Sequence, residues 1–187
     1  MPHASSAIIP CMDTNITHIA WIEVEEHCRS LAAQIAAAGF APDYLVGIAT
    51  GGVIPLALIA KEFKNSNIVT VSVSSYEKDT RGELVVKYLP KIDLAGKKIL
   101  LVDEIAETGR TLRKVADILR NEYNVAELKT VVIAVNKDKC VDRPDFFGVE
   151  GSNWFVFPWE KAEFPEYFQN SRTGEPACFG VDLNKGV

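Results

Sequence analysis

The sequence predicts an α/β fold with a mainly parallel sheet flanked by helices. Short, continuously apolar runs alternate with segments whose apolar residues recur at helical spacing, and glycine or polar turn residues separate them. Continuous apolar runs of this length are typical of strands that are buried on both faces, as in a parallel sheet. The 187 residues, of which 48% are hydrophobic, are enough for one domain with a substantial core.

The first third of the chain predicts a helix, a strand and a second helix. Apolar residues recur every three or four positions through residues 21–38, and Gly39 follows as a C-terminal cap. The apolar run 44–49 predicts a strand that leads into a Thr-Gly-Gly turn at residues 50–52. Residues 53–61 then predict a helix with proline in its first turn. Glycines at such a turn let backbone N–H groups approach a pyrophosphate, although an ordinary turn also uses glycine.

Two further strands are predicted around a polar segment. Residues 68–74 are apolar or β-branched, and residues 83–88 alternate like a half-buried strand. Residues 75–82 between them are charged and turn-forming. This composition is usual for a solvated loop and is also typical of a mobile lid, because lids are drawn from weakly packed segments.

The most informative stretch is residues 99–112. Four apolar residues run into Asp103 and Glu104, Glu107 follows three residues later, and Thr-Gly-Arg-Thr then opens an apolar helical pattern that reaches Tyr123. We interpret this as a buried strand whose C-terminal end carries two acids, followed by a loop and a helix N-terminus. The acids can accept hydrogen bonds from sugar hydroxyls, and the N–H groups at the helix start can take a phosphate.

The last predicted sheet strand covers residues 129–135 and ends at the polar segment 136–139. The aromatic segment 154–160 is expected to follow that strand, either as core or as a face that stacks on a planar base. Ligands of such folds lie beyond the carboxyl ends of the strands. A site is therefore expected where four segments meet: residues 50–52, 75–82 and 103–111, and Lys137.

Composition excludes several classes of protein. The net charge of −5 gives no general attraction to nucleic acid or to an anionic membrane, and no apolar run reaches the ~20 residues of a membrane span. The four cysteines lack metal-ligand spacing and are predicted to be reduced thiols of a cytoplasmic protein. We expect one domain over residues 1–187, with a loose leader at 1–15 and a C-terminal extension at 161–187.

Four segments together resemble the 6-oxopurine phosphoribosyltransferases, most closely the bacterial xanthine-guanine branch. They are Ala-Thr-Gly-Gly-Val-Ile-Pro at 49–55, Ser-Ser-Tyr at 74–76, the stretch 102–111, and Trp-Phe-Val-Phe-Pro-Trp-Glu at 154–160. The similarity runs from about residue 19 to residue 160. It implies the type I phosphoribosyltransferase fold with a small hood and lid. It also implies an enzyme that converts phosphoribosyl pyrophosphate (PRPP) and a purine base to the nucleoside 5′-monophosphate and pyrophosphate.

The resemblance also implies a role for individual residues, with Mg²⁺ as the cofactor and PRPP and a purine base as the partners. By that likeness, one carboxylate takes a proton from the purine, and other residues bind PRPP, the base or the metal. These are Glu107 as the base; Asp103, Glu104, Thr108, Gly109, Arg110 and Thr111 for ribose and 5′-phosphate; Thr50, Gly51 and Gly52 for pyrophosphate; Ser75, Tyr76 and Arg81 in the lid; Lys137, Trp154 and Phe155 for the purine; and Asp103, Glu104 and Glu160 for Mg²⁺.

The chain departs from the family pattern at two positions. Glu107 stands where the family most often has Asp, and Thr50 stands where the xanthine-guanine enzymes carry Arg. Arg81 or Lys78 is expected to supply the missing positive charge. Two alternatives stay open: transfer to a different heterocyclic base, and a regulator that senses PRPP or nucleotides and needs a basic face to bind nucleic acid. We expect a homo-oligomer.

Overall fold

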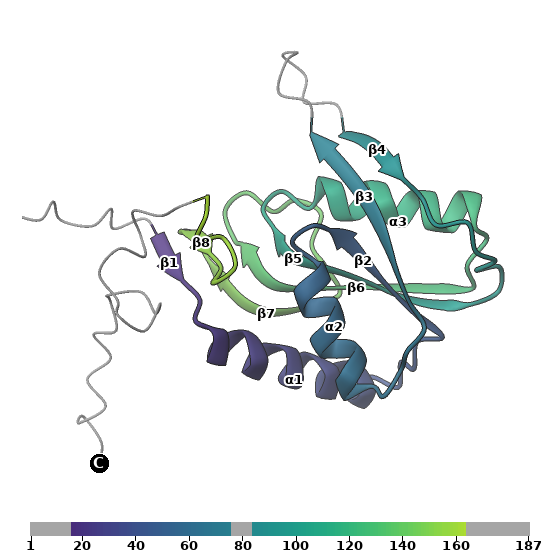
Figure 1. Cartoon of the computed structure of the whole chain (residues 1–187), viewed down its shortest axis with the longest axis horizontal. Helices are drawn as coiled ribbons and strands as arrows, with labels where there is room; N and C mark the ends of the chain where they lie inside the picture. The colour runs from purple at the N-terminus through teal and green to yellow at the C-terminus, as the bar shows by residue number, and fades with distance from the viewer. Residues whose placement is uncertain (1–15, 76–83, 164–187) are drawn as a thin grey trace, which may run out of the picture.

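The structure, a computed structural model, describes residues 16–75 and 84–163 (Figure 1). This part of the chain forms three helices and eight strands in the order expected of an α/β fold. In chain order they are β1 (Ile16–His18), α1 (Trp21–Ala37), β2 (Tyr44–Ala49), α2 (Val53–Glu62), β3 (Ile68–Ser75), β4 (Leu84–Tyr88), β5 (Lys98–Ala106), α3 (Arg110–Glu122), β6 (Glu127–Asn136), β7 (Phe146–Gly151) and β8 (Trp154–Val156).

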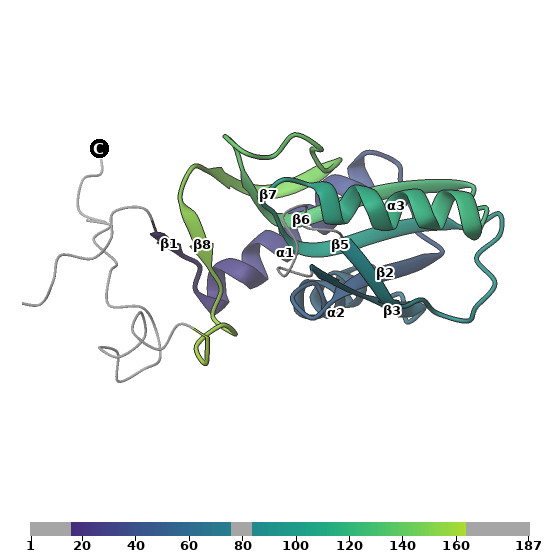
Figure 2. The ribbon, with the colours of Figure 1, turned by 90° about the horizontal axis from the view of Figure 1, so that it is seen from above.

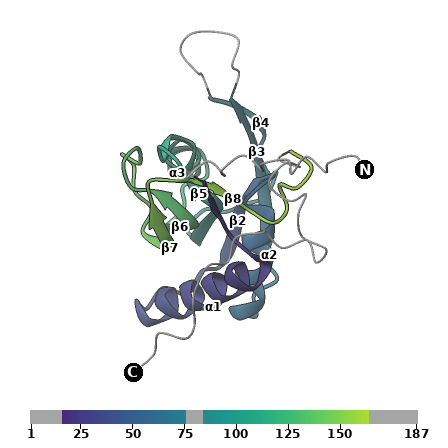
Figure 3. The same cartoon turned by 90° about the vertical axis from the view of Figure 1, so that its left-hand side faces the viewer.

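A six-stranded sheet forms the centre of the molecule, with strand order β4-β3-β2-β5-β6-β7. All neighbours are parallel except β3 and β4, which form an antiparallel pair at one edge. Helices α1 and α2 cover one face and α3 covers the other, as Figures 2 and 3 show. This arrangement confirms the predicted fold class. None of these three helices is long and apolar enough to cross a membrane.

Alternating side chains of the central strands bury two separate cores. Leu100 and Val102 of β5 point into a core with α1 and α2. Ile99 and Leu101, which alternate with them along the same strand, point to the opposite face, into a second core with α3. Because successive residues of a strand face opposite sides, a strand covered on both faces must be apolar throughout. The predicted helical face of α1 packs into the first core, through Val24, Cys28, Leu31 and Ile35.

Strand β2 leaves the sheet before its neighbour β5 ends. The pairing of β2 with β5 stops at Gly47 and Val102, and a cis peptide bond joins Ala49 to Thr50. Strand β5 continues through Asp103 to Ala106 because β6 still pairs with it on the other side. The order of the sheet also reverses between β2 and β5, which makes this gap the switch point where ligands bind in open α/β sheets.

Three features differ from the sequence prediction. Residues 146–151 form β7, a further parallel strand of the sheet, so 129–135 is not the last one. The aromatic segment begins with β8, which pairs in parallel with β1 in a separate two-stranded sheet. Strand β5 is also longer than expected. Glycines at 148 and 151 weaken the strand signal of β7, and three-residue strands such as β1 and β8 form only through partners distant in sequence.

Asp145 fixes β7 to its neighbour β6. Its Oδ2 accepts hydrogen bonds from the backbone N–H and the hydroxyl of Thr130, both at 2.8 Å, and Oδ1 lies 3.2 Å from Nζ of Lys129. Burial by itself raises the pKa of Asp145, but these hydrogen bonds outweigh burial, and the pKa is lowered. A carboxylate with a lowered pKa in the folded state stabilises the fold at neutral pH.

We therefore expect Asp145→Ala to lower the free energy of unfolding by about 1–2 kcal/mol at pH 7, allowing for the partial exposure of the carboxylate. The stabilisation is fully present above the pKa of unfolded Asp, about 3.9, and is lost as pH falls through the lower pKa of the folded state. Urea unfolding at pH 7 and pH 3 checks this. Asp138→Ala, at the exposed turn after β6, is the control. An equal deficit for Asp145→Ala at both pH values contradicts the role of the charge.

Candidate active site

A cavity of about 320 Å³ opens at the C-terminal ends of β2 and β5. It lies at the gap where β2 leaves the sheet, and its size is in the range of small-molecule sites. Most of the residues that were expected to bind PRPP line it. They are Thr50, Gly51, Asp103, Glu104, Glu107, Thr108, Gly109 and Thr111, together with apolar neighbours such as Ile105 and Leu112.

The two adjacent acids lie at the floor of this cavity against the Thr-Gly-Gly turn. Asp103 is buried, and its Oδ1 accepts the N–H of Glu104 at 3.0 Å. Burial is the main cause that raises the pKa of Asp103, and the neighbouring Glu104 carboxylate adds to the effect. The Glu104 side chain lies directly on Gly51, where an added Cβ would overlap the carboxylate. Gly52 also lacks room for a side chain, since its Cβ would lie 2.7 Å from the Ile48 carbonyl oxygen and 2.8 Å from that of Val102.

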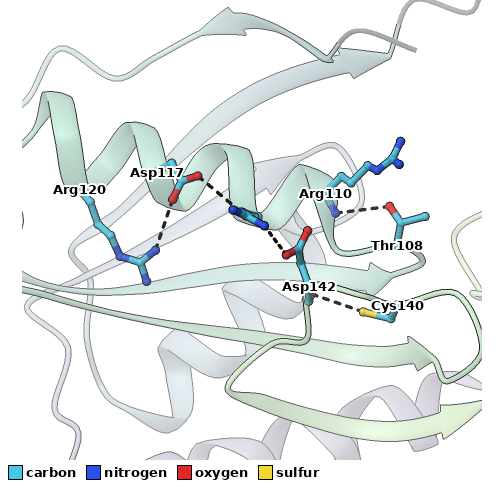
Figure 4. Close-up of polar contacts among 7 residues, drawn as sticks. Thr108, Arg110, Asp117, Arg120, Cys140 and Asp142 are labelled. Atoms are coloured by element: carbon cyan, nitrogen blue, oxygen red, sulfur yellow. Dashed lines mark hydrogen bonds and ion pairs between the residues drawn. The ribbon is translucent and has the colours of Figure 1, made fainter. Parts of the chain in front are cut away.

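Residues 107–109 form a loop that leads into α3. Together with the first two helical residues, 110 and 111, this loop is here called the phosphate loop, after its predicted ligand. Gly109 precedes the helix with φ +81°, a left-handed conformation that glycine adopts at little cost. The Thr108 hydroxyl accepts the N–H of Arg110 at 3.4 Å, as Figure 4 shows. The loop and the first turn of α3 thus present hydroxyls and backbone N–H groups at one end of the cavity. This is the arrangement that binds phosphate at helix N-termini.

Two residues hold the Glu107 carboxylate: Asn136, the last residue of β6, and Lys139 in the turn that follows. Its Oε1 lies 2.7 Å from Nζ of Lys139 and 3.3 Å from Nδ2 of Asn136. Its Oε2 is buried and has no hydrogen-bond partner among the described residues. Sequence analysis selected neither Lys139 nor Asn136. Their position in the polar segment after β6 was a signal, but nothing in the sequence indicated which lysine reaches the carboxylate.

The residues expected to bind the purine lie outside the cavity lining. Lys137 is exposed directly after β6, and its backbone N–H donates to the Gly151 carbonyl at 3.0 Å. Trp154 is 47% exposed at the start of β8. The Phe155 side chain is buried in the core with α1 and α2, so only its backbone is available to a ligand.

Glu160 closes the turn after β8. Its Oε2 accepts the N–H of Phe157 at 2.7 Å. Burial is the main cause that raises the pKa of Glu160, and the charges of Glu104 and Glu163 raise it further, against the hydrogen bond from Phe157. The Glu160 carboxylate therefore lies close enough to Glu104 for their charges to interact.

The expected lid falls largely outside the described residues. Ser75 is the last residue of β3, and Tyr76, Lys78 and Arg81 lie beyond it. The source of positive charge near Thr50 therefore stays a prediction.

Known proteins resemble this chain over most of its length. The profile of the phosphoribosyl transferase domain matches residues 20–162. A xanthine-guanine phosphoribosyltransferase of Ruegeria sp. is 31% identical over 157 residues, which cover 78% of this chain and 85% of that protein. A protein of the same name from Chromohalobacter salexigens is 33% identical, over 76% of this chain and 82% of the relative.

Solved structures agree with the fold. A purine phosphoribosyltransferase from Pyrococcus horikoshii superposes with a TM-score of 0.71 at 24% identity, covering 78% of this chain and 94% of that one. A xanthine-guanine-hypoxanthine phosphoribosyltransferase from Helicobacter pylori has a TM-score of 0.72 at 20% identity, covering 81% and 97%. Together with the extent of the sequence match, these findings mean that the chain belongs to the phosphoribosyltransferase family, in the group that contains the xanthine-guanine enzymes.

Proposed function

We propose that this protein is a purine salvage enzyme. It transfers the phosphoribosyl group of PRPP to a 6-oxopurine (guanine, xanthine or hypoxanthine) and releases pyrophosphate and the nucleoside 5′-monophosphate. The observation that carries this proposal is the single cavity that joins the acid pair, the phosphate loop and the Thr-Gly-Gly turn. Their order matches the groups of PRPP, with ribose hydroxyls between a 5′-phosphate and a pyrophosphate.

Each part of the cavity has a chemical partner in PRPP. Asp103 and Glu104 accept hydrogen bonds from the ribose hydroxyls. The hydroxyls of Thr108 and Thr111 and the N–H groups of the phosphate loop, with Gly109 and Arg110, bind the 5′-phosphate. Thr50 and the backbone at Gly51 and Gly52 bind the pyrophosphate, because glycine there allows a close approach.

Mg²⁺ is the cation that the family implies, and the residues present fit it. The buried Oε2 of Glu104 lacks a hydrogen-bond partner among the described residues, and Asp103 supplies a second carboxylate. No group of three or more His, Cys, Asp or Glu side chains that could hold a metal occurs in that part of the chain. This suits Mg²⁺, which is usually bound by one or two carboxylates together with substrate oxygens and water. Bound there, it would neutralise charge on the leaving pyrophosphate.

Glu107 acts in this proposal as the base that removes a proton from the purine. Lys139 and Asn136 both bind Oε1, which leaves the buried Oε2 free to accept the proton. Lys139 thereby orients the longer Glu side chain. The extra methylene of Glu relative to Asp is compatible with this role, because Asn136 and Lys139 hold the carboxylate in place.

The purine is proposed to lie against Trp154, at the start of β8. The exposed Trp154 ring offers a surface for stacking, while the backbone carbonyls of Trp154 and Phe155 read position 2 of the base. Lys137 would donate to the 6-oxygen, and Glu160 would supply a carboxylate for a second Mg²⁺. The proposal includes a homo-oligomer in the cytoplasm, in keeping with the unpaired thiols of Cys28 and Cys140.

The decisive experiment follows pyrophosphate release with PRPP, Mg²⁺ and one base at a time: guanine, xanthine, hypoxanthine, adenine or uracil. Release with a 6-oxopurine is the expected result. Release only with another base would favour a different heterocyclic acceptor. No release with any base, together with PRPP-dependent binding of nucleic acid, would favour a regulator that retains the fold.

Removing the proposed base should slow chemistry more than it weakens PRPP binding. We expect Glu107→Gln to lower kcat by about 100-fold, the usual size of a general-base contribution, while the KM for PRPP changes less than about threefold. Glu107→Asp is the matched control, because it keeps the carboxylate and should retain more turnover than Glu107→Gln. Full turnover of Glu107→Gln would place the base elsewhere.

Adding a methyl group at Gly51 should displace the Glu104 side chain without unfolding the protein. A Cβ there overlaps the Glu104 carboxylate. Because a misplacement of ~1 Å in an active site can cost ~100-fold, we expect kcat/KM for PRPP to fall by about that factor in Gly51→Ala. Gly96→Ala is the control for a general loss of stability: its φ of +69° strains alanine, but Gly96 lies outside the cavity lining and no other residue lies within 4 Å of an added Cβ, so kcat/KM should stay at the wild-type value. If both variants retain wild-type kcat/KM, Glu104 does not contact PRPP.

A further inference from the structure

The segment between β6 and β7, residues 137–145, packs against the phosphate loop and is here called the connection. The N–H groups of Val141 and Asp142 both donate to the Thr108 carbonyl, at 3.2 and 3.3 Å. The Asp142 carbonyl lies so close to Gly109 that an added Cβ would overlap it. The Cys140 thiol donates to that same carbonyl at 3.4 Å. None of these three connection residues is among those that line the cavity, so the connection supports the loop from behind.

This contact determines the direction of one peptide group. The peptide between Thr108 and Gly109 is trans, and in a trans peptide the C=O and the N–H point in opposite directions. Because the connection holds the Thr108 carbonyl, the Gly109 N–H points away from the connection, and Gly109 itself lines the cavity. That N–H donates no hydrogen bond within the described part of the chain. It is therefore available to an anion.

An ion pair fastens the connection to the helix that follows the loop. Nη1 of Arg113 lies 2.8 Å from Oδ1 of Asp142, and the backbone N–H of Arg113 donates to the Gly109 carbonyl at 2.9 Å. Figure 4 shows Asp142 beneath the start of α3, with Thr108 and Arg110 on the loop above it. Arg113 thus binds Asp142 of the connection through its side chain and Gly109 of the phosphate loop through its backbone. It therefore links these two segments.

We propose that Asp142 and Arg113 are positioning residues for PRPP. They keep the connection against the phosphate loop, so that the Thr108–Gly109 peptide presents its N–H and not its carbonyl to the 5′-phosphate. Glycine at 109 makes such a brace necessary, because glycine places little restriction on rotation of that peptide. A flipped peptide would aim a carbonyl oxygen at the phosphate and repel it. The inference rests on the proposed function, since the anion is the phosphate of PRPP.

Simple electrostatics and positioning predict opposite effects for one variant. Asp142→Ala removes a negative charge near an anion site, so charge alone would tighten PRPP binding. Positioning predicts weaker binding, with the KM for PRPP raised by about fivefold and kcat within twofold, as expected for a partly exposed ion pair. Arg113→Ala should have the same effect, and the double variant should be no worse than either single one.

Three controls complete the test. Asp142→Asn keeps an oxygen that can accept from Arg113 and should restore most of the PRPP affinity. Arg120 lies at the far end of the same row of ion pairs: it contacts Asp117 at 3.7 Å, and Asp117 contacts Arg113 at 3.8 Å. Arg120→Ala leaves the contact of Arg113 with Asp142 in place and should leave the KM unchanged. Thermal unfolding of every variant identifies any general loss of stability. Tighter PRPP binding by Asp142→Ala, or an Asp142→Asn variant as weak as Asp142→Ala, would overturn the proposal.

Titration with inorganic phosphate separates this inference from the proposed function. Its dissociation constant should rise in Asp142→Ala and Arg113→Ala by a factor similar to that for PRPP, and an unchanged constant would count against the brace. If the wild-type protein transfers phosphoribosyl to no base, the proposed function fails, yet the phosphate titration still decides whether the connection orients the loop.

Discussion

The early departure of β2 from the sheet is the constraint on which the candidate site depends. Its pairing with β5 ends at Val102, and β5 then continues with Asp103 and Glu104 beside an open gap. The Thr-Gly-Gly turn fills one side of that gap so closely that neither Gly51 nor Gly52 has room for a side chain. The acid pair is therefore in contact with the turn, and the phosphate loop follows at the far end of β5. The turn at residues 50–52 and the contiguous stretch 103–111, which are distant from one another in sequence, therefore line one cavity because β2 ends before β5.

Much of the fold and of the cavity lining could be predicted from sequence, because both are encoded locally. Strands β2, β5 and β6 are continuous apolar runs, and α1 and α3 carry clear helical periodicity. The phosphate loop is contiguous, so its residues reach one place whatever the rest of the chain does. Strands β1, β7 and β8 were missed because two are very short, the third contains glycines, and each depends on a distant partner. The contact of Lys139 with Glu107 was missed for a related reason, since it forms only when the connection folds back onto the loop.

The connection after β6 links the two chemical halves of the site. Through Lys139, together with Asn136 of β6, it binds the carboxylate of Glu107, the proposed base, and through Val141 and Asp142 it binds the loop proposed to hold the 5′-phosphate. Glu107 and Thr108 are adjacent, so both contacts fall on one short stretch. The longer acid at position 107 thus belongs to a set of interactions with this connection. The base position and the adjoining loop therefore share one supporting segment, which contacts each of them through different residues.

The central claim is that the cavity at the gap between β2 and β5 binds PRPP through Asp103 and Glu104. Calorimetric titration of PRPP into the wild-type protein and into Glu104→Gln, with and without Mg²⁺, tests it most directly. We predict that the wild-type protein binds PRPP more tightly with Mg²⁺, and that Glu104→Gln loses most of this enhancement and binds at least about tenfold more weakly. Equal affinity of both proteins in the presence of Mg²⁺ would contradict a PRPP site at this place.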